Sequence, residues 1–212
     1  MLRELNDVNG ASEITAKYAS ICLKEFDEEL VGAEFGVAYG GGIEKIGKLW
    51  SGRGIIYGFD TFSGHPQEII DKCQDTLADG GKSSHAATCM NPWYSKYGVN
   101  ELSVDYIRSK LNEQNLYNVN LVKGVVSQDT DLSFIPYLNY CLIDFDYPQS
   151  MVDVWNLVKG KIVSGGYLCL HDVVPKGHIN GLWEKYQNML NENLYEVIEE
   201  VNCSYISVLR KK

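Results

Sequence analysis

Five short runs of mostly apolar residues recur along the chain, and each is nearly continuous in its apolar character instead of alternating. They span residues 31–37, 54–60, 118–124, 140–146 and 166–172. Strands of a parallel sheet have this pattern because helices cover both of their faces. Apolar residues at helical spacing lie between or before these runs, at residues 11–30, 43–51, 101–115, 149–162 and 179–191. This alternation predicts an open α/β sheet with helices on both faces.

The C-terminal tail, "YEVIEEVNCSYISVLRKK", has a different pattern. Two strand-like runs meet at "VNCS" with no helical spacing between them. Such a pair is typical of an antiparallel hairpin. The sequence therefore predicts seven strands, five of them parallel and the last two forming a terminal antiparallel pair.

The connection between the second and third runs is longer than one crossover helix requires. Its middle is rich in Gly, Ser and turn residues, and it carries Trp93, Tyr94 and Tyr97. Long connections in compact domains are often lids over a ligand. We therefore expect a single domain over residues 1–212, with an N-terminal helix at 11–30 and a lid insertion at 61–100; a structural flap is the alternative interpretation.

Charge narrows the classes of partner. The chain has 19 basic and 28 acidic residues, a net charge of −9. Nucleic acids and anionic membranes are bound through cationic contacts, so both are poor partners for this chain, and a small molecule is favoured. No apolar run approaches the roughly 18 residues of a membrane-spanning helix, and "MLRELNDVNG" does not resemble a signal peptide. These features predict a cytoplasmic protein, and they leave both a monomer and a homo-oligomer open.

Glycines follow the first predicted strand in "VGAEFGVAYGGGIEKIGKLW". Gly36, Gly40, Gly41 and Gly42 let the backbone approach a ligand closely and lead it to the positive N-terminus of the next helix. The spacing is not the GxGxxG of dinucleotide-binding proteins. Glu34, just inside the strand end, would repel a pyrophosphate and suits a ligand with a cationic group.

An acidic residue, Asp60, closes the second predicted strand. An acid at this place in a βαβ unit can accept hydrogen bonds from both ribose hydroxyls of a nucleoside. Asp60 has a second interpretation, in which it caps the turn "TFSG".

Further acids close the fourth and fifth predicted strands. "LIDFDYPQS" contains Asp144 and Asp146, and "LCLHDVVP" contains His171 and Asp172. Adjacent strands of a sheet lie about 4.8 Å apart, so these groups can converge on one ion. Oxygen ligands suit a hard cation such as Mg²⁺. Helix capping by the same acids is the alternative.

The motifs "AEFGVAYGGG", "YGFDTFSGHP", "LVKGVVSQDT", "LIDFDYPQSMVDVWNLV" and "VSGGYLCLHDV" occur in this order. The order resembles that of the macrocin O-methyltransferase family of S-adenosylmethionine-dependent methyltransferases, over residues 31–172. The resemblance implies a Rossmann-like class I methyltransferase fold. The positions that it places around the cofactor are Glu34, Gly36, Gly40, Gly41, Asp60, Thr61, Ser127, Gln128 and Asp144.

The same resemblance implies a divalent metal held by Asp146, His171 and Asp172. His171 departs from the Asp-Asp ending of metal-dependent members, and imidazole is a softer ligand than carboxylate. Asp144 or His171 would act as the general base. The predicted activity is O-methylation of a hydroxyl on a small molecule, such as a sugar or another natural product.

Two other functions stay open at this stage. One is an NAD(P)-dependent oxidoreductase on a similar sheet, which the missing GxGxxG disfavours. The other is a non-catalytic module that keeps a nucleoside pocket, which the His171 departure allows.

Overall fold

The computed structural model of the chain describes residues 11–64, 102–145, 147–173, 181–201 and 205–212. Its strands are β1 (Leu30–Phe35), β2 (Gly54–Asp60), β3 (Val119–Lys123), β4 (Leu138–Ile143), β5 (Ile162–His171), β6 (Tyr195–Val201) and β7 (Ile206–Lys211). Its helices are α1 (Ala11–Glu25), α2 (Gly41–Leu49), α7 (Val104–Glu113), α8 (Pro148–Val158) and α9 (Leu182–Asn191). The predicted lid, with Trp93, Tyr94 and Tyr97, lies outside the described residues apart from its first four positions.

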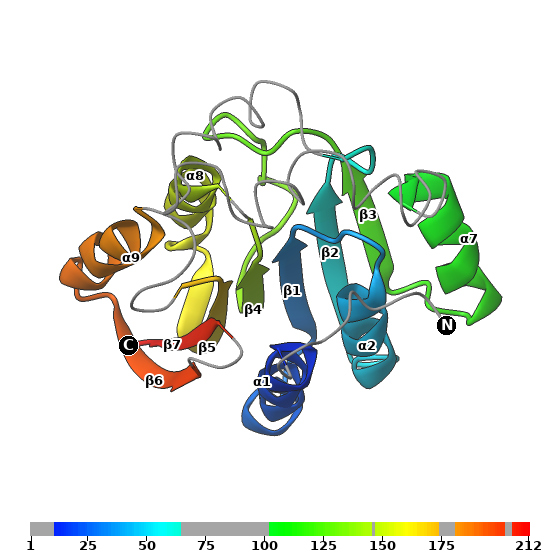
Figure 1. Cartoon of the computed structure of the whole chain (residues 1–212). Helices are drawn as coiled ribbons and strands as arrows, with labels where there is room; N and C mark the ends of the chain where they lie inside the picture. The colour runs from blue at the N-terminus through cyan, green and yellow to red at the C-terminus, as the bar shows by residue number, and fades with distance from the viewer. Residues whose placement is uncertain (1–10, 65–101, 146, 174–180, 202–204) are drawn as a thin grey trace.

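The seven strands form one sheet in the order β3-β2-β1-β4-β5-β7-β6 (Figure 1). β1 to β5 pair in parallel, and β7 pairs antiparallel with both β5 and β6. The predicted α/β sheet and its terminal antiparallel hairpin are confirmed. Because β7 enters between β5 and β6, it alone runs against the other strands, and β6 is parallel to β5.

Helices cover both faces of the sheet, and alternate residues of β1 enter the two resulting cores. Val31, Ala33 and Phe35 pack in the core that contains residues of α8 and α9. Leu30 packs in the core that contains residues of α1, α2 and α7. Side chains alternate across a strand, so Glu34 lies on the same face as Leu30, toward α2.

Most elements differ from their predicted bounds by a few residues, and two of these differences have a clear physical reason. α1 ends at Glu25, not at residue 30, because Asp27, Glu28 and Glu29 would crowd negative charge at the negative end of the helix. β5 begins at Ile162, four residues earlier than predicted, since Ile162 pairs with Leu138 and the strand continues through an irregularity before Tyr167 pairs with Tyr140.

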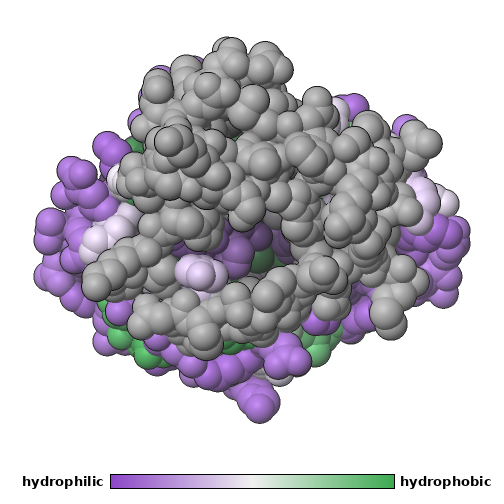
Figure 2. Space-filling view, viewed as in Figure 1, coloured by the Kyte–Doolittle hydropathy of each residue, from purple (hydrophilic) through white to green (hydrophobic). Residues whose placement is uncertain are grey.

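The described surface seen in Figure 2 is mostly hydrophilic, with hydrophobic residues showing in small areas. Among the residues that the structure describes, no helix has the length and apolar character needed to cross a membrane.

Candidate functional site

The backbones of β1 and β4 approach closely at their carboxyl ends. Gly36 permits this approach because it has no side chain. The Asp144 amide donates to the Phe35 carbonyl at 2.8 Å. Gly36 has φ +94°, and a Cβ placed on it would lie 2.2 Å from the Asp144 carbonyl oxygen. Only glycine fits this position, because of the close approach of β4; the predicted approach of Gly36 to a ligand stays a prediction.

The glycine run forms the start of α2. Gly40 is the N-cap residue in the left-handed conformation, with φ 82°, and Gly41 and Gly42 belong to the first turn. A Cβ on Gly42 would lie 3.0 Å from Glu34 Oε1. The bare first turn therefore gives room to the Glu34 side chain beneath it, while the amides of the helix start carry partial positive charge.

Glu34 is a buried acid, with only 3% of the residue exposed. Its Oε2 has no hydrogen-bond partner among the described residues. Burial raises the pKa of the Glu34 carboxyl well above its ordinary value, and the nearby charges of Asp144 and Asp60 raise it further. A buried polar atom without a partner is costly, and such atoms concentrate at binding sites. The arrangement suits a cationic or hydrogen-donating ligand group.

Asp60 joins the loop after β1 to the end of β2. Its Oδ2 accepts hydrogen bonds from the amides of Val37 and Ala38, at 2.8 and 3.0 Å, and its Oδ1 accepts one from the Phe62 amide at 2.8 Å. The turn-capping interpretation of Asp60 is thus correct. The ribose interpretation stays a prediction alongside it.

The Thr61 hydroxyl does not use up the hydrogen-bond acceptors of the Asp60 carboxylate. The Thr61 hydroxyl lies 3.3 Å from Asp60 Oδ1 and 2.5 Å from the Gly64 carbonyl oxygen. One hydroxyl has one proton, and the shorter contact takes it. Asp60 Oδ1 therefore keeps a lone pair for a further donor, such as a ribose hydroxyl.

Ser127 and Gln128 lie in the loop after β3, on a turn in which the Ser127 amide donates to Thr130 Oγ1 at 2.9 Å. Gly124, at the start of this loop, donates its amide to the Asp60 carbonyl at 2.9 Å. The loop is therefore anchored to the end of β2. Ser127 is half-buried and Gln128 is exposed, and their predicted position near the adenine stays a prediction.

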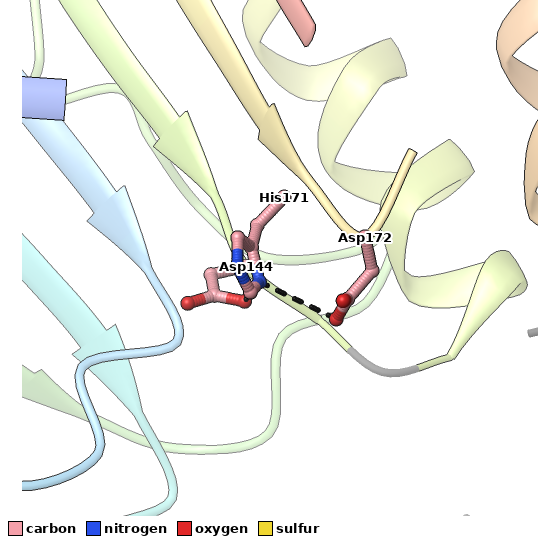
Figure 3. Close-up of side chains that lie close together, drawn as sticks. All are labelled: Asp144, His171 and Asp172. Carbon is pink, nitrogen blue, oxygen red and sulfur yellow. Dashed lines mark ion pairs between the residues drawn. The ribbon is translucent and has the colours of Figure 1, made fainter. Parts of the chain in front are cut away.

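Asp144, His171 and Asp172 converge at the ends of β4 and β5 (Figure 3). His171 Nδ1 lies 2.8 Å from Asp144 Oδ1 and 3.3 Å from Asp172 Oδ2. The side chain of Asp172 is 6% exposed, against 26% for His171 and 36% for Asp144. The predicted convergence of these strand ends is thus observed for three of the four residues, while Asp146 lies outside the described residues.

The protonation of His171 follows from its two acidic neighbours. Burial acts to lower the pKa of His171, but the charges of Asp144 and Asp172 outweigh it and raise the pKa well above the ordinary value. When no cation is bound, the two acids therefore favour the protonated form of His171. Asp144, the more exposed of the two predicted bases, is open to an acceptor from the solvent side.

Three residues at this edge of the sheet have a backbone conformation that sequence reasoning missed. Ala38, Phe62 and Asp172 have φ of 47°, 51° and 60°. Positive φ is strained for residues other than glycine, and such strain often concentrates at functional sites. No local signal marks Ala38, because its amide is fixed by Asp60 from another strand, whereas Phe62 lies within the turn that Asp60 caps.

Ser207 on β7 holds the chain just beyond Asp172. Its hydroxyl is buried and donates to the Val173 carbonyl at 2.7 Å. We expect Ser207→Ala to lower the free energy of unfolding by about 1–3 kcal/mol, because the buried carbonyl loses its partner. Urea denaturation measures this loss. Ser51→Ala, at an exposed position, should stay within about 0.5 kcal/mol of the wild type; equal stability of the two variants would show that the Ser207 bond contributes nothing.

Comparison with known proteins gives matches in structure alone. No protein-family model matches the sequence, and no curated protein is similar to it in sequence. The O-methyltransferase NovP is similar in structure with a TM-score of 0.63 and 18% identity, over 95% of this chain and 79% of NovP. SMU.1697c of Streptococcus mutans, solved in complex with S-adenosylhomocysteine (SAH), has a TM-score of 0.57 and 13% identity, over 100% of both chains. An rRNA methylase of Streptococcus thermophilus has a TM-score of 0.54 and 10% identity, over 93% of this chain and 94% of the methylase.

These three proteins have the same sheet architecture as this chain. The names of two of them point to different acceptors, an oxygen atom for NovP and ribosomal RNA for the S. thermophilus protein. The likeness therefore concerns the architecture and leaves the acceptor undetermined. By its sheet order, its terminal hairpin and these likenesses, the chain has the Rossmann-like fold of the class I methyltransferases.

Proposed function

We propose that the protein is an S-adenosylmethionine-dependent methyltransferase that methylates a hydroxyl group of a small molecule. The observation that carries the proposal is the buried Glu34 carboxylate, whose Oε2 lacks a hydrogen-bond partner among the described residues. It lies beneath a helix start that has no side chains at Gly41 and Gly42. A ligand with a cationic amino acid portion and a nucleoside matches this combination.

Each predicted cofactor residue has a role in this proposal. Glu34 faces the cationic end of the cofactor, and the backbone of Gly36, Gly40 and Gly41 passes close to it. Asp60, with the lone pair that Thr61 leaves, accepts from the ribose hydroxyls. Ser127, Gln128 and Asp144 are the remaining proposed contacts of the cofactor. When bound, S-adenosylmethionine supplies an electrophilic methyl group on a positive sulfur.

The acids of β4 and β5 prepare the acceptor. Asp144, His171 and Asp172, with Asp146 as a further candidate, would hold a divalent cation, which would lower the pKa of a neighbouring hydroxyl. We assign removal of the hydroxyl proton to Asp144, the more exposed of the two predicted bases, with 36% of its side chain exposed against 26% for His171. The oxygen of the acceptor then has a lone pair to direct at the methyl carbon.

The charge of the site disfavours a nicotinamide dinucleotide. Asp60 and Asp144 lie close enough to Glu34 to raise its pKa, and a pyrophosphate would add further negative charge beside these acids. The net charge of −9 likewise supports a small acceptor over a nucleic acid.

Calorimetry and a labelled-methyl assay test the proposal. We expect one equivalent of SAH to bind, and we expect label from S-adenosylmethionine to reach a polyol or phenol from an acceptor panel. A chelator should reduce the transfer, and added divalent ions should restore it. Absence of SAH and S-adenosylmethionine binding would contradict the proposed function, whereas binding without turnover on any acceptor would favour a non-catalytic nucleoside-binding module.

A further inference from the structure

We propose that the site formed by Asp144, His171 and Asp172 selects a first-row transition ion, such as Mn²⁺, Fe²⁺ or Co²⁺, over Mg²⁺. The inference rests on the proposed function in one respect, namely that these residues hold a cation. It adds the chemical class of that cation, and it follows from the donor atoms of this chain.

The spacing of the donor atoms fits one face of an octahedral site. Bonds of about 2.1 Å around an octahedral ion place neighbouring donors roughly 3.0 Å apart. His171 Nδ1 lies 2.8 Å from Asp144 Oδ1 and 3.3 Å from Asp172 Oδ2. One ligand atom from each of the three residues lies within 4.8 Å of the other two. The three donors can thus bind one ion on one side and leave its other positions to water or to an acceptor hydroxyl.

The nitrogen of His171 is the unusual member of this set. His171 Nδ1 is buried and, despite its two short ionic contacts, makes no hydrogen bond of acceptable geometry in the described residues. These ionic contacts hold the ring nitrogen between the two carboxylates, the place from which it could bind a cation together with them. Figure 3 shows the His171 ring beside Asp144, with a dashed line from the ring to Asp172.

The position of the third donor is fixed by the fold. Asp172 is nearly buried and has a left-handed backbone, with φ 60°. The next residue, Val173, is held by the Ser207 hydroxyl at 2.7 Å. A carboxylate that is fixed in this way adapts little, so the nature of the donors, more than rearrangement, decides which ion binds.

Ligand chemistry then separates the two classes of ion. Mg²⁺ prefers oxygen donors, near-ideal octahedral geometry and several retained waters. Imidazole nitrogen suits first-row transition ions better than Mg²⁺, and the affinity of a mixed nitrogen and oxygen site rises along the series from Mn²⁺ through Fe²⁺ to Co²⁺. With one imidazole and two carboxylates, the site presents less negative charge than an all-carboxylate site and includes a donor that Mg²⁺ binds poorly.

Metal titration of the purified chain tests the proposal without any methyl transfer. Co²⁺ is added while its visible absorption is recorded, and Mg²⁺ and Mn²⁺ are added as competitors. We expect Co²⁺ to bind in a 1:1 ratio and at least about tenfold more tightly than Mg²⁺, with the affinity for Mn²⁺ between the two. Equal or tighter binding of Mg²⁺ by the wild type would overturn the proposal, and so would failure of Co²⁺ and Mn²⁺ to bind.

His171→Asp supplies the matched change of donor. It restores an all-oxygen site and should shift the ratio of Mg²⁺ to Co²⁺ affinity toward Mg²⁺ by about tenfold or more. An unchanged ratio would overturn the proposal. Asp105→Asn, which removes a highly exposed carboxylate on α7, should leave the ratio unchanged. If His171→Asp fails to fold, His171→Asn is used instead. This variant should lose Co²⁺ binding, and its Co²⁺ affinity is compared with that of the wild type.

SAH calorimetry in the same preparations keeps the two proposals apart. SAH binding with a preference for Mg²⁺ would overturn the cation assignment and leave the methyltransferase proposal standing. Co²⁺ binding without SAH binding would do the reverse.

Discussion

Gly36→Ala is expected to destabilise the protein by roughly 4 kcal/mol or more and to abolish SAH binding. Two effects add at this position. The new Cβ would lie 2.2 Å from the Asp144 carbonyl oxygen, and φ is +94°, a region that alanine rarely adopts. Relief requires β1 and β4 to separate, which displaces both Glu34 and Asp144. Urea denaturation and calorimetry with SAH measure the two losses.

Gly52→Ala separates strain from overlap. Gly52 also has a positive φ, +75°, but a Cβ on it would meet nothing within 4 Å. We expect this control to lose only about 1–2 kcal/mol, the cost of the left-handed conformation, and to bind SAH normally. Similar losses for the two variants would show that the contact between β1 and β4 is not tight.

The strands could be predicted from sequence because each one is covered on both faces and is therefore apolar along its length. β2 matches its predicted bounds, and β1 and β3 differ by one or two residues. The start of β5 could not be predicted, because only the pairing of Ile162 with Leu138 of β4 shows that the strand begins before the predicted run at 166–172.

The candidate site was predictable to the extent that its residues end strands. Parallel strands bring their carboxyl ends to one edge, so Glu34, Asp60, Asp144 and His171 had to lie near one another. The links of Asp60 to the amides of Val37 and Ala38 could not be predicted, because backbone amides look alike in sequence. The left-handed backbone at Asp172 could not be predicted either. The residue after it, Val173, is held by Ser207, which comes from the distant strand β7.

The acids at this edge of the sheet repel one another in the free protein, and this repulsion points to a bound ligand. Glu34, Asp60 and Asp144 lie close enough for the latter two to raise the pKa of the first. Folded proteins keep such repulsion where a ligand relieves it. A cation at the glycine turn would favour the ionised form of Glu34, so binding of the cofactor and release of the Glu34 proton are expected to be coupled.

Glu34→Gln is expected to weaken SAH binding by roughly 10- to 100-fold, because the cationic amino group of the ligand loses a charged partner. The same change should stabilise the free protein near neutral pH, on the order of 1–3 kcal/mol, since it removes a buried acid without a complete set of partners. Calorimetry and urea denaturation over a pH series measure both effects.

The pH dependence of stability has a definite sign for Glu34. Its pKa is raised in the folded state, so the folded protein retains a proton that the unfolded chain loses above about pH 4.3. Wild-type stability therefore falls as pH rises from there toward the folded pKa. The variant lacks this decline, and its advantage over the wild type should grow with pH across that window.

Glu44→Gln is the matched control for both effects. Glu44 is equally buried, in the first turn of α2, but it pairs with Lys48 at 2.5 Å. Removing its charge should cost stability, because the ion pair and the favourable position at the helix start are lost, and SAH binding should stay unchanged. If Glu34→Gln also lost stability and kept its SAH affinity, Glu34 would be a structural acid like Glu44, and the cationic pocket beneath the glycine turn would have no support.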